Sequence, residues 1–300
     1  MNTNQNKIRF SRFERLLRED KLDKEINHSN SLLKSQLIAL GYLLVTFIIY
    51  KLFEKFVPDF NLSLLWNRTD DIWGSVLKYW YVFVWGIGLS ILIPLNTGSL
   101  AKTTKIFALD TFTGTLAGIW EEIGYRGLFI FTSIVSIMIF NFLFKYVIII
   151  VVAIIIVYII IKITDANILR VIFLIGGVAL CIWIAKADVI DNPLYWFYEK
   201  IMIPIWSFIS FGLLDPIIKQ KDFSFLFIIG AMSANIKFRD GHKYQSLFGY
   251  INAWIIGYIL LHAMMYYGLW VAIIIHAIYD ILIGLTRFIK RLIINKSETL

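Results

Sequence analysis

The chain has 300 residues, of which 59% are hydrophobic and only 17% are charged, and its net charge at pH 7 is +8. A soluble domain has about 25% charged and about 45–50% apolar residues, so the composition excludes a soluble enzyme, a disordered chain, a collagen-like fibre and a disulfide scaffold. The apolar excess lies in long stretches that do not alternate as the strands of a membrane β-barrel do. The composition therefore predicts an all-α, polytopic transmembrane helix bundle.

The positive charge fits a membrane protein better than a nucleic-acid-binding protein. Lys and Arg residues hold cytoplasmic loops on the inner side of the membrane and contact anionic lipids. No basic module interleaved with aromatic residues is present, so we expect membrane lipids as partners and no nucleic acid. Cys181 is the only cysteine and lies in an apolar stretch, where a structural role is expected.

Residues 1–35 form a basic, polar segment that we predict to be a cytoplasmic N-terminal tail. It suits either a short amphipathic helix on the membrane surface or a solvated tail. No removable signal peptide is expected, because no short apolar stretch with a small-residue cleavage site opens the chain. Residues 36–300 are predicted to form one integral membrane domain.

Nine apolar segments follow the tail, and they lie at 37–57, 79–98, 106–144, 146–163, 169–186, 201–218, 223–238, 249–267 and 269–286. The third would be roughly 58 Å long as one helix, about twice the hydrocarbon thickness, so we expect either a break or bend near residues 122–127 or a first half that lies obliquely. The C-terminal tail is basic and is also predicted to be cytoplasmic. With both ends inside, the number of crossings is even, and we predict about eight spans in the cell membrane, with one segment not spanning it fully.

Ionisable residues inside apolar segments are costly and usually functional. Glu122 and Arg126 are four residues apart and share a helix face, so they can pair. Glu121 lies about 100° away around the axis and has no local partner. Such an unpaired carboxylate away from water suits a general base. The alternative is a plain ion pair at a helix end, with its charges reaching toward headgroups.

Three histidines lie in or beside the later apolar segments. His276 and Asp280 are also four residues apart, and they fit either a site or a pair that bonds neighbouring helices. His276 lies roughly 12 Å along a helix from Gly268. His242 follows the segment 223–238 in a polar turn that needs no special explanation. His262 has no companion at helical spacing, and we interpret it as an interhelical hydrogen-bonding residue.

Together these polar groups can line a pocket inside the membrane. A glutamate base beside a histidine, with further groups to hold an oxyanion, suits water-mediated acyl hydrolysis. Two histidines and a carboxylate are also a common set of zinc ligands, so a metal site is the alternative.

Three motifs, EEIGYR, FRDGH and HAIYD, occur in this order over residues 106–286. They resemble the CAAX protease and bacteriocin-processing family, also called the Abi family, whose pattern is E-E-x-x-x-R, F-x-x-x-H and H-x-x-x-N/D on membrane helices. Gly127 after Arg126 also fits. The resemblance implies an intramembrane, glutamate-type endopeptidase in which Glu122 and Arg126 form a supporting pair.

By motif position, the resemblance implies that Glu121 activates water together with His242, and that His276 and Asp280 stabilise the oxyanion. It implies no cofactor, and zinc is not favoured. Asp280 stands where many members have Asn, and an ionised Asp cannot donate to an oxyanion, so it must be protonated or must orient His276. The expected substrate is a membrane-associated peptide or a membrane protein.

Two other functions remain open. The chain can be a non-catalytic immunity or regulatory protein of the same family, acting for instance in bacteriocin self-immunity. It can also be a transporter that uses the buried acids and histidines as a proton relay. A transporter of this kind predicts inverted repeats, and the sequence contains none that we can detect.

Overall fold

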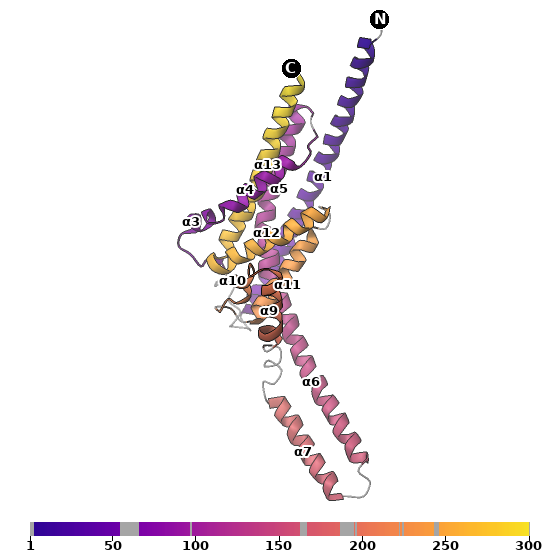
Figure 1. Ribbon diagram of the computed structural model, residues 1–300, viewed down its shortest axis with the longest axis vertical. Coiled ribbons are helices and arrows are strands. Elements are labelled where there is room, and N and C mark those ends of the chain that lie inside the picture. Colours follow the sequence, from indigo (N-terminus) through magenta and orange to yellow (C-terminus); the bar gives the residue numbers. More distant parts are fainter. Residues whose placement is uncertain are drawn as a thin grey trace. The chain divides into compact units, whose positions relative to one another are not determined.

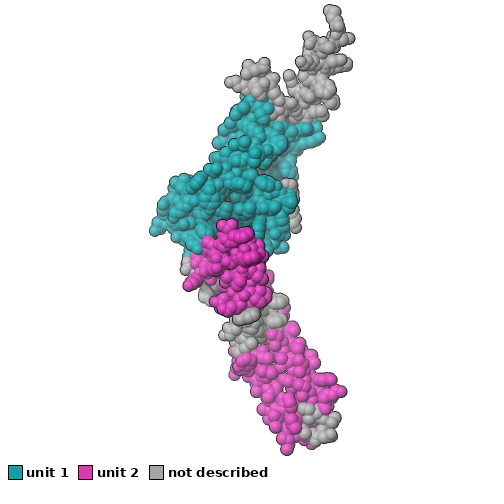
Figure 2. Space-filling model, in the orientation of Figure 1, with its two compact units in different colours: residues 1–128, 235–300 teal, residues 129–234 magenta. Residues whose placement is uncertain are grey.

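The computed structural model describes residues 3–54, 66–96, 98–162, 167–186, 195, 197–221, 223, 225–242 and 246–299. All regular elements in these ranges are helices, which confirms the predicted all-α class for the described part of the chain (Figure 1). The chain divides into two compact units (Figure 2). Unit 1 consists of residues 1–128 and 235–300, and unit 2 consists of residues 129–234.

The described residues of unit 1 form six whole helices, the start of a π-helix and the end of a seventh α-helix. They are α1 (Thr3–Glu54), α3 (Ile72–Leu77), α4 (Trp80–Leu92), α5 (Leu100–Glu121), η1 (Glu122–Phe129), α11 (Phe225–Gly241), α12 (Ser246–Tyr267) and α13 (Leu269–Thr299).

The centre of unit 1 is the antiparallel pair α5 and α13 (Figure 1). Small residues bring the two helices close together. A Cβ on Gly118 would lie 2.8 Å from the backbone nitrogen of Ala277, and a Cβ on Gly114 would lie 2.7 Å from the Cβ of Asp280. Close approach through small residues is the usual way for membrane helices to pack, because no hydrophobic force drives them together in lipid.

Helix α1 continues without interruption through the predicted tail at 1–35 and into the predicted span at 37–57, whose last three residues lie outside the described part. The second half of the tail packs against α5, because Leu22 and Ile26 are buried together with Ile106. Asp23 accepts a hydrogen bond from Lys102 of α5 at 2.8 Å. Residues 20–35 therefore form part of the body of unit 1.

Helices α12 and α13 supply most of the buried apolar side chains of unit 1. They are joined at Gly268, whose φ of 102° is accessible to glycine and strained for other residues. A Cβ there would lie 2.8 Å from the carbonyl oxygen of Trp66 and from the backbone nitrogen of Arg68. The turn thus needs glycine both for its conformation and for its contact with the chain before α3.

Three described helices are long and apolar enough to cross a membrane, and they lie at Asn167–Lys186, Leu247–Tyr267 and Leu269–Ile294. They match the predicted segments 169–186, 249–267 and 269–286, and they indicate a membrane protein. Shorter apolar helices lie at Trp80–Leu92 and Tyr146–Lys162.

Two predicted segments are interrupted. A break was predicted in one of them and not in the other. The segment 106–144 changes at Glu122 from α5 to the π-helix η1, so the predicted break takes the form of a widened turn. The segment 79–98 is helical only to Leu92, because Ile93 is extended with ψ of 128° and Pro94 follows it. A residue before proline is disfavoured in the helical conformation, which ends α4 early.

Unit 2 begins with a pair of helices, α6 (Ile130–Lys162) and α7 (Asn167–Lys186), in which Gly177 packs directly on Ile156. The rest of unit 2 consists of short helices and the start of α11; the short ones are η2 (Tyr198–Met202), α9 (Ile203–Ile209) and α10 (Asp215–Ile218). The predicted segment 201–218 is therefore not one helix. Phe211 and Gly212 both have positive φ and form a turn in its middle.

Candidate active site

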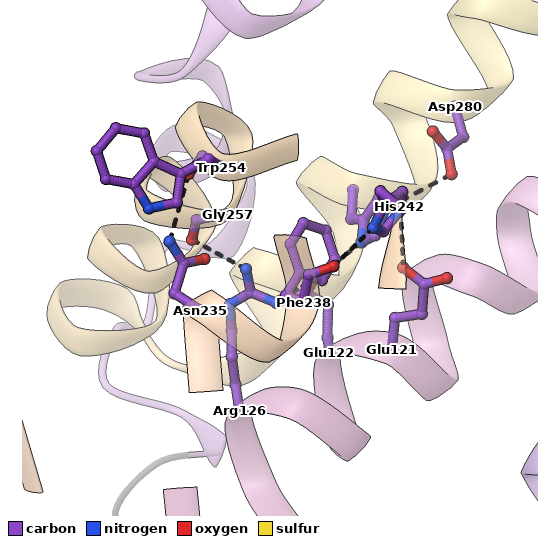
Figure 3. Close-up of polar contacts among 10 residues, drawn as sticks. Glu121, Glu122, Arg126, Asn235, Phe238, His242, Trp254, Gly257 and Asp280 are labelled. Carbon is purple, nitrogen blue, oxygen red and sulfur yellow. Dashed lines mark hydrogen bonds and ion pairs between the residues drawn. The ribbon is translucent and has the colours of Figure 1, made fainter. Parts of the chain in front are cut away.

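The candidate site is formed entirely by residues of unit 1. Figure 3 shows Glu121, Glu122 and Arg126 on the segment that joins α5 to η1, with His242 next to Glu121 and the carboxylate of Asp280 directed toward the histidine side chains. The backbone changes at this point from α-helical to π-helical hydrogen bonding. Single π-helical turns are rare and are frequent at functional sites, because the extra residue re-aims the side chains.

Glu122 and Arg126 form the ion pair that their spacing predicts. Arg126 Nη1 donates to Glu122 Oε1 at 2.8 Å, and the two residues are 2% and 0% exposed. Arg126 Nη2 also donates to the carbonyl oxygen of Gly257 on α12 at 2.9 Å. Its guanidinium lies 4.9 Å from the ring centre of Phe238 on α11. The pair is thus a buried connection between η1, α11 and α12.

His276 contacts two carboxylates, one of which its spacing predicts. Its Nδ1 lies 2.7 Å from Oε1 of Glu122, and its Nε2 lies 3.6 Å from Oδ2 of Asp280. Because a carboxylate accepts hydrogen bonds, Nδ1 donates to Glu122. The same Glu122 oxygen therefore accepts from both Arg126 and His276. The contact between Glu122 and His276 connects the EEIGYR motif to the HAIYD motif. The sequence alone predicts only the pair within each motif.

His242 and Glu121 lie next to each other, as the motif order implies. His242 Nε2 is 3.8 Å from Glu121 Oε2, which is beyond hydrogen-bonding distance. His242 Nδ1 lies 2.8 Å from the carbonyl oxygen of Phe238 and donates to it, so Nε2 faces Glu121. Oε2 of Glu121 is buried and has no hydrogen-bond partner.

Burial lowers the pKa of His242, which follows the end of α11, below its ordinary value. The hydrogen bond to the Phe238 carbonyl acts in the opposite direction and is the smaller effect. A neutral imidazole with its proton on Nδ1 has a lone pair on Nε2. His242 is therefore able to accept a proton at the position next to Glu121.

A cavity of about 790 Å³ connects these groups, and Glu121, His242, His276 and Asp280 all line it. Its volume falls in the usual range for small-molecule or peptide sites. Glu122 and Arg126 are buried but do not line the cavity. The cavity reaches Asp110 and Arg287 at the far end of the α5–α13 pair.

Glycines at three positions make room for the site. Asp280 packs on Gly114, as described for the α5–α13 pair. A Cβ on Gly257 would lie 2.0 Å from Oδ1 of Asn235, a residue 3% exposed, whose Nδ2 donates to the carbonyl oxygen of Trp254. A Cβ on Gly241 would lie 2.7 Å from the hydroxyl of Tyr125. These three glycines are the feature of the sequence from which close packing around the motifs could have been predicted.

The remaining predicted residues have simpler roles. His262 Nδ1 lies 2.7 Å from the hydroxyl of Tyr79, which confirms it as a hydrogen-bonding residue between segments. Cys181 carries a free thiol. In the part of the chain that the structure describes, no three or more His, Cys, Asp or Glu side chains are grouped to hold a metal ion. Independence of metal stays a prediction from the resemblance.

None of the known family models, curated proteins or solved structures matches this chain. The resemblance to the CAAX protease and bacteriocin-processing family therefore rests on the three motifs.

Proposed function

We propose that the chain is an intramembrane endopeptidase of the CAAX protease and bacteriocin-processing type, which hydrolyses a peptide bond with a water activated by Glu121. The observation that carries the proposal is the cavity in which Glu121 and His242 lie 3.8 Å apart, with His276 and Asp280 on the same lining. An orphaned carboxylate oxygen beside a neutral histidine is the arrangement that general-base activation of water needs.

In this mechanism Glu121 removes a proton from a water molecule, and the oxygen attacks the carbonyl carbon of the scissile bond. The negative charge moves to the carbonyl oxygen. His276 already donates from Nδ1 to Glu122, so its Nε2 is the atom that can donate to this oxyanion from inside the cavity. The carboxylates of Glu122 and Asp280 lie on the two sides of this ring, 2.7 Å from Nδ1 and 3.6 Å from Nε2.

The reaction is completed by the collapse of the tetrahedral intermediate. The carbon–nitrogen bond breaks, and the proton taken by Glu121 passes to the leaving amine directly or through His242. Arg126 has no contact with the cavity and acts on the reaction through Glu122, whose position it fixes. We therefore treat Glu122 and Arg126 as positioning residues and Glu121, His242 and His276 as catalytic residues, with Asp280 orienting His276.

The topology belongs to the same proposal. We propose about eight membrane spans with the site inside the bundle, and we propose that residues 1–35 and 287–300 lie on the cytoplasmic side. The partners are then a peptide or membrane-protein substrate and the lipids around it. Labelling of single cysteines at both ends with an impermeant reagent tests this, because labelling from opposite sides of the membrane contradicts an even number of spans.

The decisive experiment compares peptide termini in membranes and in secreted material of the wild type and the Glu121→Gln strain. A Glu199→Gln strain is the matched control, since that glutamate is exposed and pairs with its neighbour Lys200. Protein amounts are matched by blotting. Termini present in the wild type and the control but absent in Glu121→Gln establish a peptidase and identify its substrates.

The alternative is a non-catalytic immunity or regulatory protein. It predicts identical termini in all three strains and a native phenotype that survives both Glu121→Gln and His276→Ala at normal abundance. That combined result contradicts the peptidase mechanism.

A further inference from the structure

The start of α4 and the helix before it carry an exposed apolar surface that the candidate site does not use. We name it the aromatic patch and define it by Trp73, Leu77, Trp80, Tyr81 and Trp270. These side chains are 65%, 65%, 61%, 45% and 46% exposed. We propose that the aromatic patch binds the headgroup region of a lipid bilayer and anchors unit 1 at one membrane surface.

The short helix α3 buries Ser75 and Val76 on one face and exposes Trp73 and Leu77 on the other. Its N-terminus is capped by Asp71, which accepts a hydrogen bond from Gly74 N at 2.8 Å. Val76 and Tyr79 point inward and are 2% and 3% exposed. An amphipathic helix in water places polar groups on its outer face, so an outer face of Trp and Leu indicates a partner that is not water.

The position of the patch favours lipid over another protein as that partner. The turn at Gly268 connects two helices that are long and apolar enough to span a membrane, so it belongs at a membrane surface. Arg68 N donates to the carbonyl oxygen of Tyr267 at 3.2 Å, and Arg68 Nη1 donates to that of Met265 at 2.6 Å. These bonds hold the chain before α3 against this turn. Trp66 packs on Trp270 with ring centres 5.4 Å apart.

The chemistry of the patch also fits the boundary between hydrocarbon and water. Trp and Tyr are enriched there because their rings are apolar and their N–H or O–H groups still reach polar partners. Lys78 lies next to the patch, with Nζ 4.6 Å from the ring centre of Tyr267. Its ammonium group also donates to the hydroxyl of Tyr267 at 3.4 Å, which places a positive charge beside the patch, and positive charges at a membrane surface attract anionic lipids. Before it, Asp70 lies exposed in a polar turn.

The anchor also fixes the depth of the candidate site. His276 lies eight residues beyond Gly268 on α13, which corresponds to roughly 12 Å along the helix axis. The contact between His276 and Glu122 therefore lies within the leaflet whose headgroups meet the patch, and not at the midplane of a bilayer with a hydrocarbon core about 30 Å thick.

The test uses the full chain in phosphatidylcholine–phosphatidylglycerol vesicles. In a Cys181→Ala background, single cysteines replace Trp73, Leu77 or Asp70 and carry a nitroxide label. Accessibility to oxygen, which concentrates in lipid, is compared with accessibility to a water-soluble nickel complex. We expect the oxygen-to-nickel ratio to be severalfold higher at positions 73 and 77 than at position 70, with a depth near the headgroups.

Two results overturn the proposal. Equal, water-like accessibility at all three positions shows that the patch faces water. Protection of positions 73 and 77 from both reagents, with spin–spin broadening, shows that a second copy of the chain covers it.

Fluorescence provides a measurement that does not depend on the cysteine variants folding. Lipids brominated near the headgroup should quench the wild-type protein more than the Trp73→Phe/Trp80→Phe double variant does under the same conditions. Quenching that is unchanged in the double variant contradicts the anchor, because the two tryptophans then lie away from the bromine atoms.

Discussion

His276 Nδ1 lies 2.7 Å from Oε1 of Glu122, although the two residues are 154 positions apart in the chain. The same oxygen accepts from Arg126 at 2.8 Å, so one buried carboxylate orients both a guanidinium and an imidazole. The contact makes the Glu122–Arg126 pair part of the site and not only of the helix on which it lies. Stability and activity should therefore respond together when Glu122 is changed.

Glu122→Ala should lower the stability of the protein by about 3 kcal/mol, because it leaves the charge of Arg126 buried and uncompensated. Thermal unfolding in detergent measures this as a lower Tm. Glu199→Ala is the control, since its side chain and that of Lys200 are about half exposed and such pairs contribute about 0–1 kcal/mol. An equal Tm for the two variants contradicts the role assigned to Glu122.

Asp280→Asn should keep cleavage within about tenfold of the wild type, whereas Asp280→Ala should lose about 10²–10³-fold, because His276, the donor to the oxyanion, then loses the group that orients it. An asparagine still offers an oxygen to His276 Nε2, now 3.6 Å from Asp280 Oδ2, and adds a donor for the oxyanion. The substrates found by terminal profiling supply the assay. If both variants lose activity equally, the negative charge of Asp280 is what matters.

Cleavage should fall as the pH is lowered below about 6.5, the ordinary pKa of histidine, because His242 then takes up a proton. Because burial lowers the pKa of His242, the loss begins below this ordinary value and not above it. A rate–pH profile in proteoliposomes measures it. Activity that rises as the pH falls through this range would require a protonated His242 and would contradict its assignment as a proton acceptor.

Gly118→Ala should destabilise the protein by about 1–3 kcal/mol, as overpacking in a core does. The added Cβ would lie 2.8 Å from the backbone of Ala277, and a backbone atom cannot turn away as a side chain can. Gly88→Ala is a matched control on α4, because no atom lies within 4 Å of a Cβ there. The control should unfold at the same temperature as the wild type or slightly above it, since alanine favours helix over glycine.

Glu25→Gln should weaken the attachment of α1 to α13 by about 1.5–3 kcal/mol, the usual worth of a hydrogen bond to a charged group. Glu25 Oε1 accepts from Arg287 at 2.9 Å and from Arg291, which is 1% exposed. Asp20→Asn breaks an exposed pair with Lys24 on α1 and should have no measurable effect. Greater protease sensitivity of α1 in Glu25→Gln alone would be the observable difference.

Helical spacing accounts for what the sequence predicted correctly at the site. Glu122 with Arg126 and His276 with Asp280 are each four residues apart, and a single helix places such residues on one face. The break near residues 122–127 was predictable from length, because no helix of that size fits one crossing. Its form, a π-helix, was not, since no residue pattern distinguishes it from a bend.

Contacts between distant segments could not be predicted from spacing. Nothing local indicates that Glu122 contacts His276, or that Phe238 receives the guanidinium of Arg126. The basic tail illustrates the same limit, because its charges suggested either a helix on the membrane surface or a solvated tail. Two of its acids, Asp23 and Glu25, instead bind cations of α5 and α13. Composition gives only the overall charge and polarity of a segment, whereas a few paired side chains determine where the segment packs.

Because Glu122 and His276 are 154 residues apart in the chain, the site can form only after translation has passed both residues. A ribosome adding about 5–20 residues per second needs roughly 8–30 s to reach His276 after Glu122. Until the end of this interval, Arg126 lacks the histidine that shares its carboxylate, and for most of it Arg126 also lacks the Gly257 carbonyl. A chain truncated before α13 therefore has Glu121 and His242 but neither His276 nor Asp280, and its catalytic centre is incomplete.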